Sequence, residues 1–144
     1  MHYKPKVSFD FDGTIGHKND IQEYCKTLLS NNQVEVFITT RRYGPDSKGN
    51  PEDPWWVNIG TKNWEEVYKL ADTLGINRDN IHFCNMKMKY DYLKDKDFLW
   101  HLDDDMLEVE EINMLPDTRA IWINEDWLTE CNKLINENIK SSIS

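Results

Sequence analysis

The chain has 144 residues, of which 39% are hydrophobic and 30% are charged, so we expect one soluble globular domain over residues 1–144. Its formal net charge of −9 argues against a broad basic surface that wraps duplex DNA. This charge still permits a small phosphorylated substrate or a nucleic-acid end, held by a few local cations or a metal.

The cysteines and the hydropathy pattern bear on the compartment. Cys25, Cys84 and Cys131 are widely spaced and form no CxxC pair, so we expect buried thiols rather than disulfides or a zinc site. Such thiols are typical of a reducing compartment. The sequence begins without the apolar stretch of a signal peptide, and no apolar run reaches the ~18 residues of a membrane span. We therefore expect a cytoplasmic protein without membrane contact.

In chain order, the first half predicts two strands and one helix. Residues 7–11 are β-rich and predict a strand, and residues 34–39 predict a second. Between them, Asp20 can cap a helix over residues 21–31. Residues 41–60 hold three prolines and three glycines, which predicts a loop or a small lid over a site.

The second half continues the alternation of helices and strands. Thr61 or Asn63 can cap a helix that carries Trp64 on its apolar face and ends at Gly75. The next predicted elements are a strand at 81–84, helical turns at 88–95, a strand at 98–102, a helix containing Met106 to Met114, a strand at 120–123 and a helix at 126–139. Five strands alternating with helices predict an α/β fold, a Rossmann-like three-layer sandwich with a mainly parallel five-stranded sheet.

Polar clusters follow three of these predicted strands. Asp10 and Asp12 follow the first, residues 39–42 (TTRR) the second, and residues 103–105 (DDD) the fourth. In open parallel sheets the binding crevice lies beyond the carboxyl ends of the strands. We therefore expect the three clusters to meet at one edge of the sheet.

The acidic residues in these clusters predict a metal site. Asp10 and Asp12 are two residues apart, so both side chains leave an extended chain on the same side. Carboxylates this close repel one another and favour a bound proton or cation. With Asp103 and Asp104 they form a set of hard oxygen ligands, which suits Mg²⁺ better than Zn²⁺ and favours a phosphate substrate.

Other interpretations of the acidic residues are weaker. A calcium loop starting at Asp10 would need Gly and Glu where the chain has Ile15 and Ile21. Helix capping is the alternative for residues 103–105, and we expect Asp105 to be such a cap.

The basic and hydroxyl residues leave more than one interpretation open. Thr39 and Thr40 either end a strand or, together with the backbone amides there and the following Arg41 and Arg42, grip a phosphate. Lys87 and Lys89 precede the fourth strand, where a helical lysine is usually solvated. We expect His101 to be a core histidine with a local partner. Trp55 and Trp56 are candidates for the rim of a substrate site, where they could stack on a base.

Together these residues resemble the haloacid dehalogenase-like (HAD) phosphatase superfamily. Its motifs, in order, are a strand followed by D-x-D-G-T, an apolar strand ending in Thr or Ser, a lysine before the fourth strand, and an apolar strand ending in two aspartates. The matching segments are residues 10–14, residues 34–39, Lys89 (with Lys87 as second choice) and residues 98–104.

The resemblance implies a role for each matched residue. Asp10 would be the nucleophile that forms an aspartyl-phosphate, and Asp12 the general acid and then the base. Thr39 would bond the transferring phosphoryl group, and Lys89 would offset its charge. The implied Mg²⁺ ligands are Asp10, the backbone carbonyl of Asp12 and Asp103, with Asp104 in support.

The short stretch between Thr14 and Val34 leaves no room for a large inserted cap, so we expect a nearly capless phosphatase, open to bulky substrates.

The segment from Thr39 to Arg41 and the following loop are similar to the phosphatase domain of phage-type polynucleotide kinase-phosphatases, and 5′(3′)-nucleotidases are also similar. By that likeness Arg41 would contact the substrate phosphate. We expect a Mg²⁺-dependent phosphomonoesterase of nucleotides or oligonucleotide ends. The alternatives are a non-catalytic or regulatory phosphate-binding module of the same fold, or a phosphatase of sugar phosphates or proteins.

Overall fold

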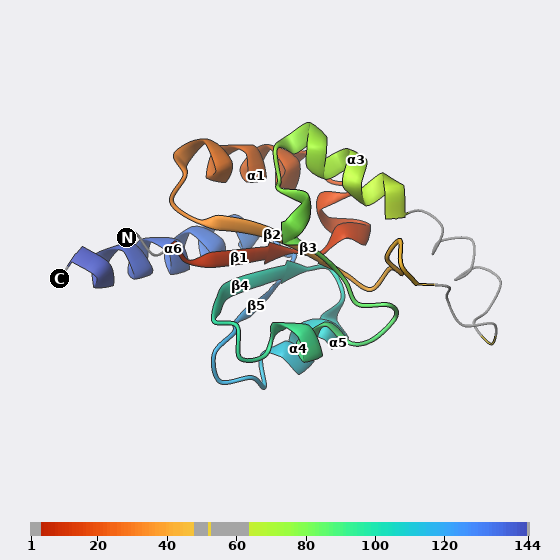
Figure 1. The fold of residues 1–144 in the computed structure, drawn as a ribbon. Coiled ribbons are helices and arrows are strands. Elements are labelled where there is room, and N and C mark those ends of the chain that lie inside the picture. The colour runs from red at the N-terminus through yellow and green to blue at the C-terminus, as the bar shows by residue number, and fades with distance from the viewer. Residues whose placement is uncertain (1–3, 48–51, 53–63, 144) are drawn as a thin grey trace.

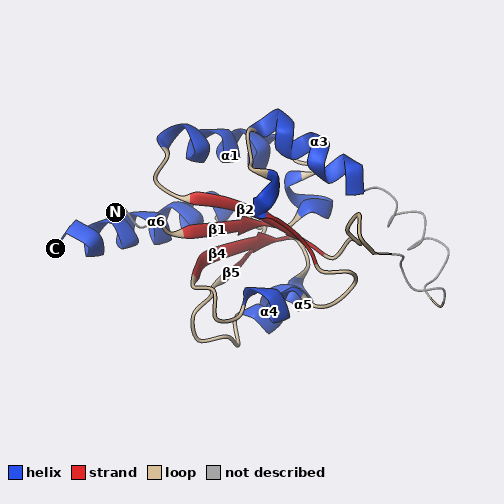
Figure 2. Ribbon diagram, in the orientation of Figure 1, coloured by secondary structure: helices blue, strands red, loops and turns tan. Residues whose placement is uncertain are grey.

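The computed structural model describes residues 4–47, 52 and 64–143, and its strands form one sheet between two layers of helices (Figures 1 and 2). The strands are β1 (Lys6–Phe9), β2 (Glu35–Thr40), β3 (Ile81–Phe83), β4 (Phe98–Asp103) and β5 (Ala120–Trp122). The helices are α1 (Asn19–Asn31), α3 (Trp64–Leu74), α4 (Lys89–Leu93), α5 (Met106–Ile112) and α6 (Trp127–Ile143), and the short turns are η1 (Phe11–Ile15) and η2 (Arg78–Asn80).

The sheet has the strand order β3-β2-β1-β4-β5, and all four strand pairings are parallel. The predicted α/β three-layer fold is confirmed, with a sheet that is wholly rather than mainly parallel. The chain builds outward from β1 to β3 and then returns to the other side of β1 with β4. The strand order therefore reverses between β1 and β4, which is where open α/β sheets place their binding crevice.

The larger core lies between the sheet and helices α1, α3 and α6 (Figure 1). Every second residue of the inner strands faces it, among them Phe9 and Trp100, whose rings meet edge to face with centroids 5.3 Å apart. Tyr24 of α1 and Trp127 of α6 pack together over this face, with ring centroids 5.4 Å apart. Cys25 and Cys131 are buried in the same core, and Cys84 is also buried, as predicted.

The smaller core lies on the other face, under α4 and α5. It consists of Leu93, Phe98, Val109, Ile112 and Ala120. The strand residues that alternate with the larger core face this side, and near the carboxyl ends of β1, β2 and β4 they are polar. The reduced apolar packing on this face makes room for a polar site.

Several boundaries differ from the sequence prediction. Strand β1 ends at Phe9, two residues early, because the chain then enters the turn η1. Helix α1 begins at Asn19, so Asp20 lies in its first turn, where its side chain accepts a hydrogen bond from the N–H of Ile21 at 2.9 Å. Helix α5 ends at Ile112, and the predicted helical residue Met114 lies beyond it.

Other local predictions are confirmed. Gly75 follows α3 with a φ of +93°, which a glycine adopts without steric cost. Asp105 caps α5 by accepting hydrogen bonds from the N–H groups of Leu107 and Glu108. The predicted caps Thr61 and Asn63, the rim residues Trp55 and Trp56 and most of the predicted loop 41–60 lie outside the described residues. Among the described helices, none is long and apolar enough to span a membrane.

Candidate active site

The predicted acidic residues meet at the reversal of strand order. Asp10 follows β1 and Asp103 ends β4, and the N–H of Asp10 donates to the carbonyl of Leu102 at 2.9 Å, which ties the two strand ends together. An open cavity of about 450 Å³ lies over this junction. Its lining consists of Asp10, Asp12, Gly13, Arg41, Lys89, Asp103, Asp104 and Asp105.

Lys89 is the cation at the centre of the site. Its Nζ donates to Asp10 Oδ1 and to Asp103 Oδ2, both at 2.6 Å, and its side chain is only 3% exposed. Burial by itself lowers the pKa of Lys89, but the two carboxylates more than offset this and raise the pKa above its usual value. Lys87 is exposed. The structure therefore places Lys89, rather than Lys87, among the acids.

The two buried carboxylates differ in how well they are neutralised. Burial raises the pKa of Asp10 well above its usual value, and this effect outweighs the nearby charge of Lys89. Asp10 also accepts a hydrogen bond from the Thr14 hydroxyl at 3.0 Å. Burial opposes ionisation of Asp103 too, but hydrogen bonds from His101 and Lys89 lower the pKa of Asp103 below its usual value. Asp10 is thus the carboxylate that is short of positive charge.

Three carboxylates in this cavity can hold a cation. Ligand oxygens of Asp10, Asp103 and Asp104 all lie within 4.8 Å of one another. This set consists of oxygen alone, with no sulfur or nitrogen, and therefore fits a hard cation such as Mg²⁺. A cation here would also supply the positive charge that Asp10 lacks. The carboxylate of Asp12 is not part of this group, although Asp12 lines the same cavity.

Gly13 lets Asp104 approach the turn after β1. A Cβ at this position would lie 2.1 Å from Asp104 Oδ2, and the φ of Gly13 is +75°, which side-chain-bearing residues rarely adopt. The glycine of the D-x-D-G-T segment is therefore needed for two reasons: the backbone has a positive φ there, and Asp104 occupies the space that a side chain would fill.

We expect Gly13→Ala to destabilise the protein by about 1–2 kcal/mol through its positive φ, and also to displace Asp104. Gly75→Ala is the matched control, because Gly75 has a φ of +93° but a Cβ at this position would lie 4.0 Å from the nearest side-chain atom. Thermal unfolding should show a lower melting temperature for both variants than for wild type. Titration with Mg²⁺ should show weaker binding in Gly13→Ala alone, and equal binding in the two variants would contradict this role of Gly13.

Asp12 is held by Arg42, one of the two arginines that the sequence offered for gripping a phosphate. Arg42 donates to both carboxylate oxygens of Asp12, at 2.6 and 3.0 Å, and to Glu66 at 3.1 Å. Its guanidinium lies 4.7 Å from the centre of the Phe11 ring. Burial lowers the pKa of Arg42, but the carboxylates of Asp12 and Glu66 raise this pKa by more than burial lowers it, so the guanidinium stays charged. The pair lies at the rim, since the Asp12 side chain is 53% exposed.

The predicted phosphate-binding residues are only partly brought to the cavity. Arg41 lines it, with Nη2 donating to the carbonyl of Met86 at 2.7 Å. The hydroxyl of Thr40 accepts from the N–H of Arg42 at 3.3 Å, and the hydroxyl of Thr39 lies 2.7 Å from that of Ser8. Both threonines are buried, and neither lines the cavity. A phosphate contact from Thr39 remains a prediction.

Glu108 is a site residue that the sequence analysis missed. It is buried on α5, accepts a hydrogen bond from the N–H of Lys89 at 3.3 Å, and lies 3.7 Å from Nε of Arg41. Burial raises the pKa of Glu108. Its position four residues before Ile112 was the available signal, because residues four apart share a helix face. Glu108 therefore supports both Lys89 and Arg41.

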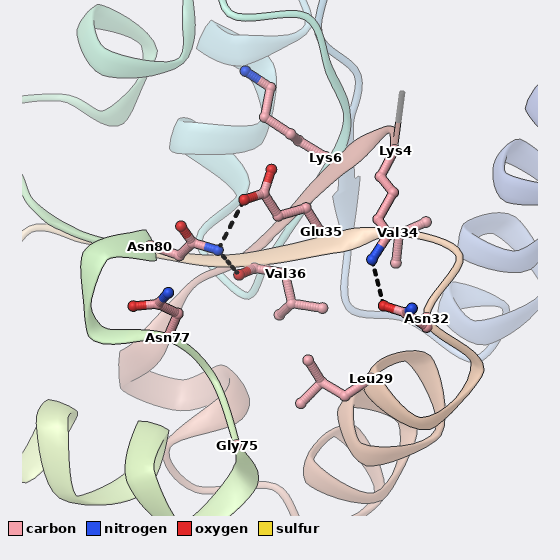
Figure 3. A pocket seen from close by; sticks show the side chains of 10 residues that line it. All are labelled: Lys4, Lys6, Leu29, Asn32, Val34, Glu35, Val36, Gly75, Asn77 and Asn80. Carbon is pink, nitrogen blue, oxygen red and sulfur yellow. Dashed lines mark hydrogen bonds between the residues drawn. The ribbon is translucent and has the colours of Figure 1, made fainter. Parts of the chain in front are cut away.

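A larger cavity of about 820 Å³ lies at the opposite edge of the sheet, at the amino ends of β1, β2 and β3 (Figure 3). Its polar lining is mostly satisfied internally. Lys4 donates to Asn32, and Asn80 donates to Glu35 and to the carbonyl of Val36. None of the carboxylates around Lys89 lies there, so the candidate active site is the smaller cavity.

Comparison with known proteins adds little to this geometry. No protein-family model matches the sequence, and no match was found among curated proteins. Among solved structures, an uncharacterized protein from Corynebacterium glutamicum is similar at 12% identity with a TM-score of 0.44, over 93% of this chain and 96% of that one. This likeness is too distant to carry an argument about function.

Proposed function

We propose that the protein is a Mg²⁺-dependent phosphomonoesterase of the HAD-like superfamily that uses Asp10 as its nucleophile. The observation that supports this proposal is the position of Lys89, whose Nζ bridges Asp10 and Asp103 although these residues are 79 and 14 positions away in the chain. The four segments that resemble HAD motifs are separate in sequence. Three of them supply side chains to one cavity.

Asp10 would attack phosphorus with a carboxylate oxygen, forming an aspartyl-phosphate as the bond from phosphorus to the leaving oxygen breaks. Lys89 would hold the nucleophile in place and offset charge on the phosphoryl oxygens. Asp103 and Asp104, with Asp10, would hold Mg²⁺. The ion, when bound, would neutralise phosphoryl charge and orient the phosphate.

Asp12 would donate a proton to the leaving oxygen and later take one from the water that hydrolyses the aspartyl-phosphate. In the described arrangement both of its oxygens are bonded to Arg42. A carboxylate held in this way only accepts hydrogen bonds. To act as an acid, Asp12 would first take up a proton from solvent at the exposed rim, and this requires that the arriving substrate loosen the contact with Arg42.

For the substrate we propose a nucleotide or an oligonucleotide end. The supporting features are the open cavity and two arginines, Arg41 and Arg42, that follow β2 beside the site. An open rim admits a bulky leaving group, and arginines suit phosphate oxygens. A sugar phosphate or a phosphoprotein would undergo the same chemistry, so selectivity needs a direct test.

The test measures phosphate release with Mg²⁺ from 3′- and 5′-nucleotides, phosphorylated oligonucleotides, sugar phosphates and an aryl phosphate. We expect turnover of the aryl phosphate and of at least one nucleotide class, and none by Asp10→Asn. Equal rates in the two proteins would overturn the assignment as a phosphatase. Turnover of sugar phosphates alone would overturn the nucleotide preference, and binding of Mg²⁺ without turnover of any compound would favour the non-catalytic module.

A further inference from the structure

A chain of buried polar groups runs across the sheet beneath the cavity. Thr39 of β2, Ser8 of β1 and His101 of β4 are each fully buried, on three adjacent strands. The Thr39 and Ser8 hydroxyl oxygens are 2.7 Å apart, and Ser8 Oγ lies 2.9 Å from His101 Nδ1. At the far end, His101 Nε2 lies 2.8 Å from Asp103 Oδ2. The chain therefore ends on a carboxylate of the candidate active site.

The geometry sets the direction of the hydrogen bond that ends on Asp103. Asp103 Oδ2 also accepts from Lys89 Nζ at 2.6 Å, and a carboxylate oxygen that accepts from an ammonium group leaves His101 Nε2 as the donor in their contact. On the other side of the ring, Nδ1 bonds to the Ser8 hydroxyl, and Ser8 bonds to the Thr39 hydroxyl. The imidazole ring is therefore held at both of its nitrogens.

These bonds nearly saturate Asp103. Its Oδ2 accepts from both His101 and Lys89, and its Oδ1 accepts from the N–H of Asp105 at 3.0 Å. A carboxylate has about four acceptor sites, so one remains, on Oδ1. Without the bond from His101, the carboxylate could turn about its bond to Cβ and give Oδ1 to Lys89 instead. The imidazole thus selects which oxygen stays available.

We propose that His101 is a positioning residue that, with Ser8 and Thr39 behind it, orients Asp103 so that Oδ1 is free to bind a divalent cation. This inference rests on the proposed function, because it concerns the cation that the proposed reaction uses. It also gives Thr39 a different role from the expected phosphoryl contact, since its hydroxyl is already bonded to that of Ser8. The isolated histidine in β4 is then part of the site rather than a core residue alone.

The experiment compares wild type, His101→Leu and His101→Gln by calorimetric titration of the substrate-free protein with Mg²⁺, and by the Mg²⁺ dependence of aryl phosphate hydrolysis. Leucine removes the donor, whereas the glutamine amide retains an N–H that reaches toward Asp103. We expect His101→Leu to weaken Mg²⁺ binding about ten- to a hundredfold, as loss of a hydrogen bond to a metal ligand typically does. Its kcat should fall at fixed Mg²⁺ while the KM for the aryl phosphate stays unchanged, and His101→Gln should recover most of the binding.

Thermal unfolding of each variant separates positioning from simple support of the sheet. If both His101 variants have a lower melting temperature but bind Mg²⁺ as wild type does, the inference is overturned. It is also overturned if His101→Leu and His101→Gln lose Mg²⁺ affinity equally. If His101→Leu does not fold, Ser8→Ala is used, which keeps the contact between His101 and Asp103 but releases the ring. A several-fold weaker Mg²⁺ affinity is expected there, and wild-type affinity would overturn the inference.

The same experiment distinguishes the two proposals. Should wild type and Asp10→Asn release phosphate equally, the proposed phosphatase activity fails, while calorimetry still reports on His101 and Asp103. Should wild type be active and His101→Leu bind Mg²⁺ normally, only the positioning role fails. A wild-type protein that shows no heat of Mg²⁺ binding would overturn the positioning role as well.

Discussion

Replacing Lys89 with methionine is expected to destabilise the protein by about 3–5 kcal/mol and to lower kcat about a hundred- to a thousandfold. Methionine retains most of the side-chain volume, so the loss reports the charge. Lys89 Nζ lies 2.6 Å from both Asp10 and Asp103, and its removal leaves these two buried carboxylates without a lysine or arginine partner among the described residues. A native protein of this size has only about 5–15 kcal/mol of stability to lose.

Lys87→Met is the matched control for this prediction, since Lys87 is exposed and precedes the same helix. We expect its free energy of unfolding to lie within about 0.5 kcal/mol of wild type, with unchanged kcat. Denaturant unfolding of the three proteins gives the comparison. Similar losses in both variants would show that the segment before β4, rather than the charge of Lys89, carries the effect.

Asp10→Asn is expected to lower kcat by roughly ten-thousandfold or more and, in EDTA, to raise the stability by about 1–3 kcal/mol. The raised pKa of Asp10 means that its ionised form is costly in the folded protein. Asparagine removes this charge, can still accept from Lys89, and leaves Lys89 paired with Asp103 in a neutral arrangement. For a chain of this length the gain corresponds to roughly 2–4 °C in melting temperature per kcal/mol.

Asp12→Asn provides the contrast. It lies on the same turn, but its carboxylate is half-exposed and paired with Arg42, so its loss should lower activity and slightly lower stability. Melting curves of the three proteins in EDTA and in Mg²⁺ test this. A destabilised Asp10→Asn would indicate that Asp10 serves mainly as a structural partner of Lys89, which would also weaken its assignment as the nucleophile.

The fold and the edge that carries the site follow from local patterns in the sequence. Alternating β-rich and amphipathic segments predict the parallel sheet, and the acids come directly after strands, as Asp10 and Asp103 do. Such short-range signals suffice because the carboxyl ends of parallel strands must lie at one edge. Hence the meeting of Asp10, Asp103 and Asp104 could be expected from spacing, whereas that of Lys89 with them was expected only from the resemblance to the HAD motifs.

Contacts between distant segments could not be predicted in this way. The bond of Arg42 to Asp12, the bond from Lys89 to Glu108 and the series of bonds from Thr39 through Ser8 to His101 join residues whose local sequences carry no sign of one another. Which buried hydroxyls bond to one another depends on the register of neighbouring strands.

Local sequence was thus enough to establish the layers of the fold, the edge that carries the site and the acids on it, because each depends on periodicity or on which residues come directly after a strand. The way protons and charges are shared among those acids emerges only when the strands β1, β2 and β4 pack together. Burial and distance in the packed sheet set the raised pKa of Asp10, the lowered pKa of His101 and the bridging position of Lys89.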